Sequence, residues 1–134
     1  MFKKLLSILL VSASMVAAQS YEGKVNVIVT FINQSGESLN SYVMAPGYYP
    51  AFETPHGGFD YQILMLEKPN TNFSIRSYGK EGSQYSTDCG FNQEDRLSCL
   101  SFGNTAYVYK VYNDSYAVNI IADDSDGFYF SNSV

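Results

Sequence analysis

Apolar and aromatic residues recur at every second position along most of the chain after residue 18. The alternation is clearest over 25–31 and over 116–122. A period of two places successive side chains on opposite faces of an extended strand. No window after residue 18 has the i, i+3, i+4, i+7 spacing of apolar residues that is typical of an amphipathic helix. The sequence therefore predicts an all-β protein.

The strands are short, and turns rich in Gly, Asn and Asp separate them. One segment, 59–66, carries apolar residues on both faces: Phe59, Tyr61, Ile63 and Met65 alternate with Leu64 and Leu66. Even spacing of short strands and polar turns is typical of a sandwich or barrel. We expect a small antiparallel β-sandwich, jelly-roll or Greek-key-like, of about eight or nine strands. The segments are 25–32, 39–45, 59–66, 73–77, 84–91, 96–102, 105–112, 115–122 and 127–130.

The first 18 residues differ from the rest of the chain. Lys3 and Lys4 precede an apolar run that ends in Val16-Ala17-Ala18. A basic start, a short apolar stretch and a small-residue cleavage site mark a secretory signal peptide. The run is shorter than the roughly 20 residues that a membrane-spanning helix needs, which argues against a transmembrane anchor. We expect a signal peptide at 1–18 and a single secreted domain at 19–134, extracellular or, in a bacterium, periplasmic.

The mature domain is acidic. Of the eight Lys and Arg in the chain, Lys3 and Lys4 leave with the signal, so six basic residues face thirteen acidic ones, a net charge of −7. Binding to a phosphate backbone requires clustered Lys and Arg. The composition therefore excludes nucleic acid as a partner.

The chain contains two cysteines, Cys89 and Cys99. In an exported protein an even pair predicts a disulfide. The closed loop of 11 residues would stabilise the fold by about 2.8 kcal/mol in the chain-entropy model. A catalytic or metal-binding thiol pair would favour C-x-x-C spacing, so we prefer the disulfide.

Residues 45–58 interrupt the strand pattern with three of the four prolines and the single histidine. Proline removes a backbone donor and fixes φ, so this stretch cannot be a central strand. A long connection without regular structure is often functional, and rigid aromatic rings bind with little loss of entropy. We expect a ligand-binding loop. In the alternative, the rings fold inward and close one end of the sandwich, which we favour for Phe52. The residues concerned are Tyr48, Tyr49, Phe52 and His56.

Two further features suggest chemistry without establishing it. Histidine is a common acid–base catalyst at neutral pH, which makes His56 a candidate, but no G-x-S-x-G, H-E-x-x-H or phosphate-loop motif accompanies it. Asp123, Asp124 and Asp126 offer oxygen ligands suited to calcium. The same residues are ordinary turn formers, and a full calcium loop is not present, so we favour a turn. No other cofactor is indicated.

Asn33, Asn72 and Asn113 each begin an N-x-[ST] triplet, a glycan acceptor site if the source is eukaryotic. Asn33 and Asn113 fall in predicted turns where a glycan would fit. Together these features favour a secreted, non-enzymatic binding domain that contacts a glycan, a lipid headgroup or a protein through the 45–58 loop. The alternatives are a secreted toxin or effector that acts on host membranes, and a small secreted hydrolase that uses His56.

Overall fold

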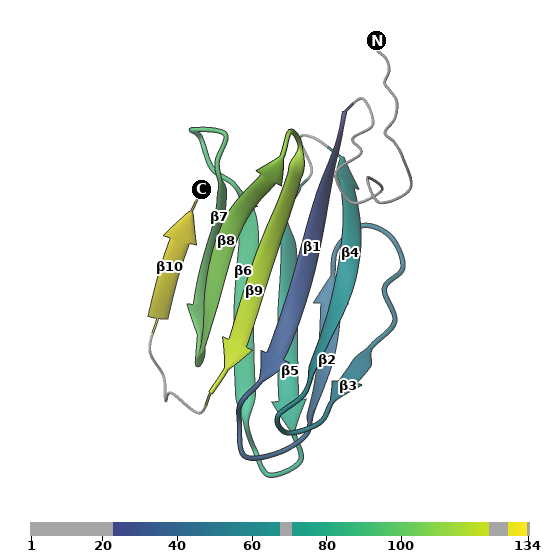
Figure 1. Ribbon diagram of the computed structural model, residues 1–134, viewed down its shortest axis with the longest axis vertical. Helices are drawn as coiled ribbons and strands as arrows, with labels where there is room; N and C mark the ends of the chain where they lie inside the picture. Colours follow the sequence, from purple (N-terminus) through teal and green to yellow (C-terminus); the bar gives the residue numbers. More distant parts are fainter. Residues whose placement is uncertain (1–22, 68–70, 124–128, 134) are drawn as a thin grey trace.

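The computed structural model describes residues 23–67, 71–123 and 129–133 of the chain. This part is all-β and contains ten strands in two sheets, as Figure 1 shows. The predicted signal peptide at 1–18 lies outside the described residues. The strands are β1 (Lys24–Asn33), β2 (Leu39–Met44), β3 (Phe52–Thr54), β4 (Phe59–Glu67), β5 (Phe73–Gly79), β6 (Gln84–Phe91), β7 (Leu97–Phe102), β8 (Asn104–Tyr112), β9 (Ser115–Ala122) and β10 (Tyr129–Ser133).

The two sheets differ in size. The four-stranded sheet has the order β4-β1-β9-β8, and the six-stranded sheet has the order β10-β7-β6-β5-β2-β3. The expectation of a purely antiparallel arrangement is wrong at one place, because β1 and β9 pair in parallel, with Val29 opposite Val118. A parallel pair needs a long crossover connection, and here the chain forms seven other strands between the two partners. The count of eight or nine strands is also too low by at least one.

The hydrophobic core lies between the sheets, which face each other in Figure 1 with the four-stranded sheet in front. The alternation predicted for β1 is confirmed, since Val25, Val27, Val29 and Phe31 are all at most 1% exposed. In β9 every second residue from Tyr116 to Ala122 is also buried, as the alternation predicts. The strand periodicity therefore identifies the core side of these strands correctly.

Strand β3 is the element that the sequence did not predict. It pairs with β2, with Leu39 opposite Thr54, at the edge of the six-stranded sheet. The 45–58 connection is thus not free of regular structure. Pro50 and Pro55 flank β3 and cannot donate to a ladder, which confines the strand to three residues at a sheet edge.

The predicted disulfide is confirmed. Cys89 on β6 and Cys99 on β7 are directly opposite each other in the antiparallel register, with their Cα atoms 4.1 Å apart. Both side chains are buried in the core. The bond therefore joins two neighbouring strands inside the six-stranded sheet.

The turn between β5 and β6 is held by a carboxylate from another part of the chain. Glu37 accepts hydrogen bonds from the backbone N–H of Glu81 at 2.8 Å and of Ser83 at 3.3 Å. A hydrogen bond from the Ser83 side chain, followed by the Glu81 N–H, lowers the pKa of Glu37 from its ordinary value of 4.5. A Cβ atom at Gly79 would lie 2.2 Å from the same carboxylate, so glycine makes room for it.

Replacing Glu37 by Gln should make the stability difference from wild type depend on pH. Because the pKa of Glu37 is lowered in the folded state, its ionised form stabilises the fold above pH 4.5, and this contribution is lost as the pH falls through the folded pKa. We expect a lower Tm for the variant at neutral pH and a difference that shrinks in acid, measured by thermal melts. Glu81→Gln, in the same turn, serves as the control. A Tm difference that stays constant down through the acid range would contradict this role.

Candidate functional site

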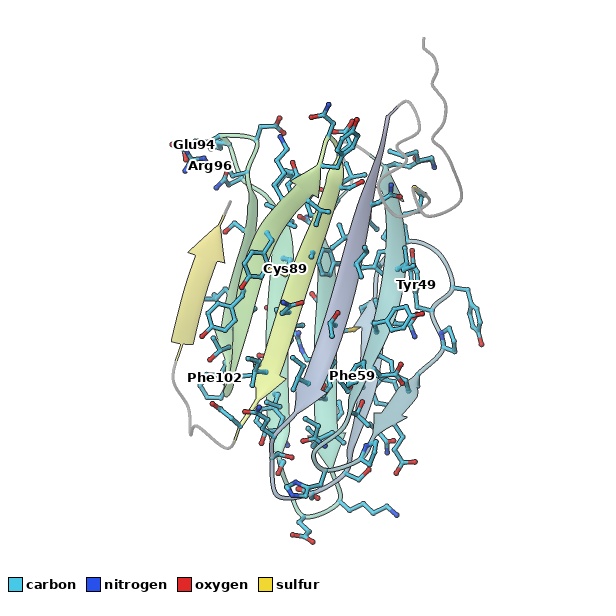
Figure 2. The ribbon with its side chains drawn as sticks, viewed as in Figure 1. Tyr49, Phe59, Cys89, Glu94, Arg96 and Phe102 are labelled. Carbon is cyan, nitrogen blue, oxygen red and sulfur yellow. A yellow bond between two sulfur atoms is a disulfide. The ribbon has the colours of Figure 1, made fainter. Side chains whose placement is uncertain are left out.

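The outward side chains of the four-stranded sheet form one continuous surface, which we call the open face. It is the face toward the viewer in Figure 2. Three rows of paired residues cross the sheet from β4 to β8 and define it. They are Phe59, Ile32, Ile121 and Thr105; Tyr61, Thr30, Asn119 and Tyr107; and Ile63, Ile28, Ala117 and Tyr109.

The open face carries no Asp, Glu, Lys, Arg or His in these three rows. Asp60 lies between Phe59 and Tyr61 on β4, opposite Phe31 and thus in the alternate set of positions, and its carboxylate accepts a hydrogen bond from the Tyr61 N–H at 2.8 Å. At the other end of the β1–β4 register, Lys24 and Glu67 are paired with each other at 2.7 Å. The pKa of the Glu67 carboxyl group is lowered, mainly by the hydrogen bond that Lys24 donates to it and further by the positive charge of Lys24. In a domain with thirteen acidic residues, an uncharged surface of this extent is a local feature that requires an explanation.

The large side chains of the open face are exposed to an unusual degree. Phe59 is 70% exposed, Tyr61 57% and Tyr107 40%, and Ile63 and Tyr109 are exposed as well. With about 200 Å² for each large side chain, these five present on the order of 500 Å² to solvent. An apolar patch of this size is at the upper end for a monomer and is often a binding surface.

The aromatic rings and the polar groups occupy different parts of the open face. The rings lie on the outer strands, Phe59 and Tyr61 on β4 and Tyr107 and Tyr109 on β8. Thr30 and Asn119, both half-buried, lie between them on the central strands. With strands about 4.8 Å apart, the two aromatic flanks are separated by about 14 Å. The surface thus offers ring faces for stacking and, in the middle row of its central strands, two polar side chains for hydrogen bonding.

The outward face of the six-stranded sheet is different in character. Arg76 and Asp88 form an ion pair there at 2.9 Å. Tyr42 and Tyr78 contact each other, with ring centroids 6.1 Å apart. This face mixes charged, polar and aromatic side chains, as most protein surfaces do. It supplies tyrosines of similar exposure for a matched control.

The structure does not bring the predicted loop residues together into one site. Tyr48 is 87% exposed, whereas Tyr49 is half-buried and packs against the core. Figure 2 shows Tyr49 beside β4. Phe52 packs edge-on against Phe31, with centroids 6.2 Å apart. The inward-folding alternative describes Phe52 and Tyr49, and Tyr48 is the ring that remains available to a ligand.

His56 takes part in a structural contact at the other side of β3. Its Nδ1 atom donates a hydrogen bond to the backbone carbonyl of Ser35. The turn that contains it is fixed to the end of β1, because Asn33 exchanges backbone hydrogen bonds with Gly57 and Gly58 at 2.8 and 2.9 Å. The partner of His56 is thus a carbonyl oxygen and neither a hydroxyl nor a carboxylate.

The three glycan triplets occupy different environments. Asn33 is fully buried, and its amide hydrogen-bonds to the carbonyls of Glu37 and Thr54 and to Ser35. The expectation that a glycan would fit at Asn33 is therefore wrong for the folded protein. Asn72 and Asn113 are exposed, Asn72 next to β5 and Asn113 in the β8–β9 turn.

The proposed calcium site falls only partly within the structure. Asp123 is exposed, and Asp124 and Asp126 lie outside the described residues. Within the described ranges, no group of three or more His, Cys, Asp or Glu side chains could hold a metal ion. The part of the chain that the structure describes also contains no helix long and apolar enough to cross a membrane.

The open face was not identified from the sequence, although one signal for it was present. Segment 59–66 is apolar at every odd-numbered position and also at Leu64 and Leu66, while only Leu64 and Leu66 are buried. Comparison with protein families, with characterised proteins and with solved structures finds no match to the chain. The function must therefore be argued from the surface itself.

Proposed function

We propose that the chain is exported after cleavage of a signal peptide at 1–18, and that residues 19–134 form a non-enzymatic β-sandwich domain that binds a ligand through the open face. The observation that carries this proposal is the combination of three uncharged rows with aromatic rings exposed on both flanking strands. Contact of such an apolar surface with water is unfavourable, so its burial by a partner would be favourable.

The scaffold supports a binding role. The rings of the open face stand on strands of a sheet that is paired throughout its width, so little conformational entropy is lost when a ligand contacts them. The buried Cys89–Cys99 disulfide agrees with a protein that works in an oxidising compartment outside the cytoplasm.

The 45–58 loop extends the same surface in this proposal. Gln62 on β4 donates a hydrogen bond to the carbonyl of Pro50 at 3.4 Å, which holds the loop against the β4 edge. Tyr48 on this loop is 87% exposed, more than any other large hydrophobic side chain in the described part of the chain. The contact surface first expected at the loop is therefore proposed on the neighbouring sheet, which the loop adjoins at β4.

The test compares two double variants of the purified mature protein. Tyr61→Ala/Tyr107→Ala removes a ring from each flank of the open face. Tyr42→Ala/Tyr78→Ala removes two rings of similar exposure, 46% and 44%, from the opposite face. The wild type is first screened on a glycan array and on neutral and anionic vesicles. We expect the first variant to bind the ligand found there at least about tenfold more weakly than the wild type does, because two stacking contacts are lost. The second should bind like the wild type. Unchanged binding by the first variant would show that the open face is not the site.

A further inference from the structure

The middle row of the open face has an order that distinguishes between partners. Across the sheet the residues run Tyr61, Thr30, Asn119, Tyr107, each paired with the next in the strand register. The tyrosines stand on the outer strands, and the hydroxyl and amide groups stand on the two central strands. In this row polar groups thus occupy the middle and aromatic rings the flanks, whereas the two neighbouring rows carry Ile32 and Ile121, and Ile28 and Ala117, on the central strands.

This order is the reverse of a typical protein interface. Protein–protein interfaces bury an apolar centre and leave the polar groups at a solvated rim. If a second copy of the chain covered the open face, Thr30 and Asn119 would lie in the dry centre, where a polar group without a hydrogen bond is destabilising. Insertion into a lipid bilayer meets the same objection, because hydrocarbon offers no hydrogen-bonding partner.

A sugar ring fits the order that is observed. One side of a pyranose ring presents C–H groups, which can pack on an aromatic face, and its edge carries hydroxyl groups. Tyrosine provides a rigid ring with a polar end, and the Asn and Thr side chains can both donate and accept hydrogen bonds. We infer that the ligand of the open face is a neutral polysaccharide, with sugar rings stacked on Tyr61 and Tyr107 and hydroxyl groups bonded to Thr30 and Asn119. This inference rests on the proposed function above.

The charge and the size of the surface narrow the ligand further. An acidic polysaccharide would meet no cation in the three rows, and Lys24 is already paired with Glu67. The net negative charge of the domain would also repel it. Because the aromatic flanks are about 14 Å apart, a chain of several sugar residues is needed to contact both, so a monosaccharide should bind poorly.

The experiment measures depletion of mature protein from solution by insoluble cellulose, chitin and β-1,3-glucan, with polygalacturonate as the anionic control. We expect at least one neutral polysaccharide to retain the wild type and polygalacturonate to retain none. Tyr61→Ala/Tyr107→Ala should weaken retention at least about tenfold. Tyr42→Ala/Tyr78→Ala should leave it unchanged. Thermal melts confirm that each variant is folded.

Asn119→Leu separates a sugar ligand from a simple apolar contact. Leucine has nearly the same size but no hydrogen-bonding group, so we expect retention on the polysaccharide to fall several-fold. An apolar partner would bind the variant equally well or more tightly. Equal or stronger retention would therefore overturn the assigned role of Asn119 and with it the inference.

Failure of the inference can be distinguished from failure of the proposed function. If none of the neutral polysaccharides retains the wild type, the inference is overturned. Light scattering after size exclusion, and vesicle sedimentation, then decide the proposed function. A dimer or a vesicle-bound form that Tyr61→Ala/Tyr107→Ala disrupts would show that the open face binds another class of partner. A wild type that is monomeric and binds neither vesicles nor glycans would overturn both.

Discussion

Cys89→Ala/Cys99→Ala will lower the free energy of unfolding by about 3 kcal/mol. The disulfide closes a loop of 11 residues, and its removal restores the freedom of that loop in the unfolded chain. Both sulfur atoms also pack in the core, so the alanines leave a small cavity, which is destabilising in addition. Urea denaturation of the two proteins under non-reducing conditions measures the difference.

Reduction provides the control for this experiment. A thiol reductant should lower the stability of the wild type toward that of the double variant and leave the double variant unchanged. If the variant unfolds at the same urea concentration as the wild type, the disulfide does not stabilise the fold in the way the structure indicates.

Asn33→Ala will destabilise the protein by a similar amount, about 2–4 kcal/mol, because it removes four hydrogen bonds at a buried site and takes the acceptor from the Ser35 N–H. The Asn33 amide nitrogen donates to the carbonyl of Glu37 at 2.8 Å and to that of Thr54 at 2.9 Å. The amide oxygen accepts from the Ser35 N–H at 2.9 Å and from the Ser35 hydroxyl at 2.6 Å. One side chain thus connects the end of β1 to the following turn and to β3.

Asn40→Ala is the matched control, since Asn40 is an exposed asparagine on β2 that points away from the core. Exposed substitutions of this kind usually change stability by less than about 0.5 kcal/mol. Thermal and urea unfolding of both variants test the comparison. A loss at Asn33 no larger than the loss at Asn40 would contradict the role assigned to the buried amide.

Local patterns predicted a large part of this fold. The bounds of β6 and β9 agree with the segments 84–91 and 115–122, and the disulfide lies between the two strands expected to carry it. These features depend on alternation and on chain chemistry over a few residues, which the sequence displays directly. The inward sets of β1 and β9 are correct for the same reason.

Such local patterns could not predict which distant strands pair with each other. The parallel contact between β1 and β9 joins residues that are 89 positions apart at Asn26 and Ser115, and nothing in either strand specifies its neighbour. Strand β3 has only three residues between prolines, too few for a period of two to be visible. Its formation depends on the partner strand β2.

The proposed binding surface could not be recognised in the sequence for a different physical reason. Alternation predicts that the more apolar face of a strand is buried, but in β4 the fully apolar odd-numbered set from Phe59 to Met65 is the exposed one, and the inward set includes Asp60 and Gln62. The tertiary structure buries Leu64 and Leu66 and leaves Phe59, Tyr61 and Ile63 in solvent. By contrast, the proline-rich 45–58 loop stood out in the sequence as a candidate site, but two of its rings, Tyr49 and Phe52, pack against the core.

The central claim is that the ligand covers the open face. Hydroxyl-radical footprinting of the tyrosines, with and without a soluble oligosaccharide of the polysaccharide that retains the protein, tests it most directly. The account predicts that bound ligand protects Tyr61 and Tyr107 from oxidation and leaves Tyr42 and Tyr78 as reactive as in the free protein. Protection of Tyr42 and Tyr78 with no change at Tyr61 and Tyr107 would contradict it.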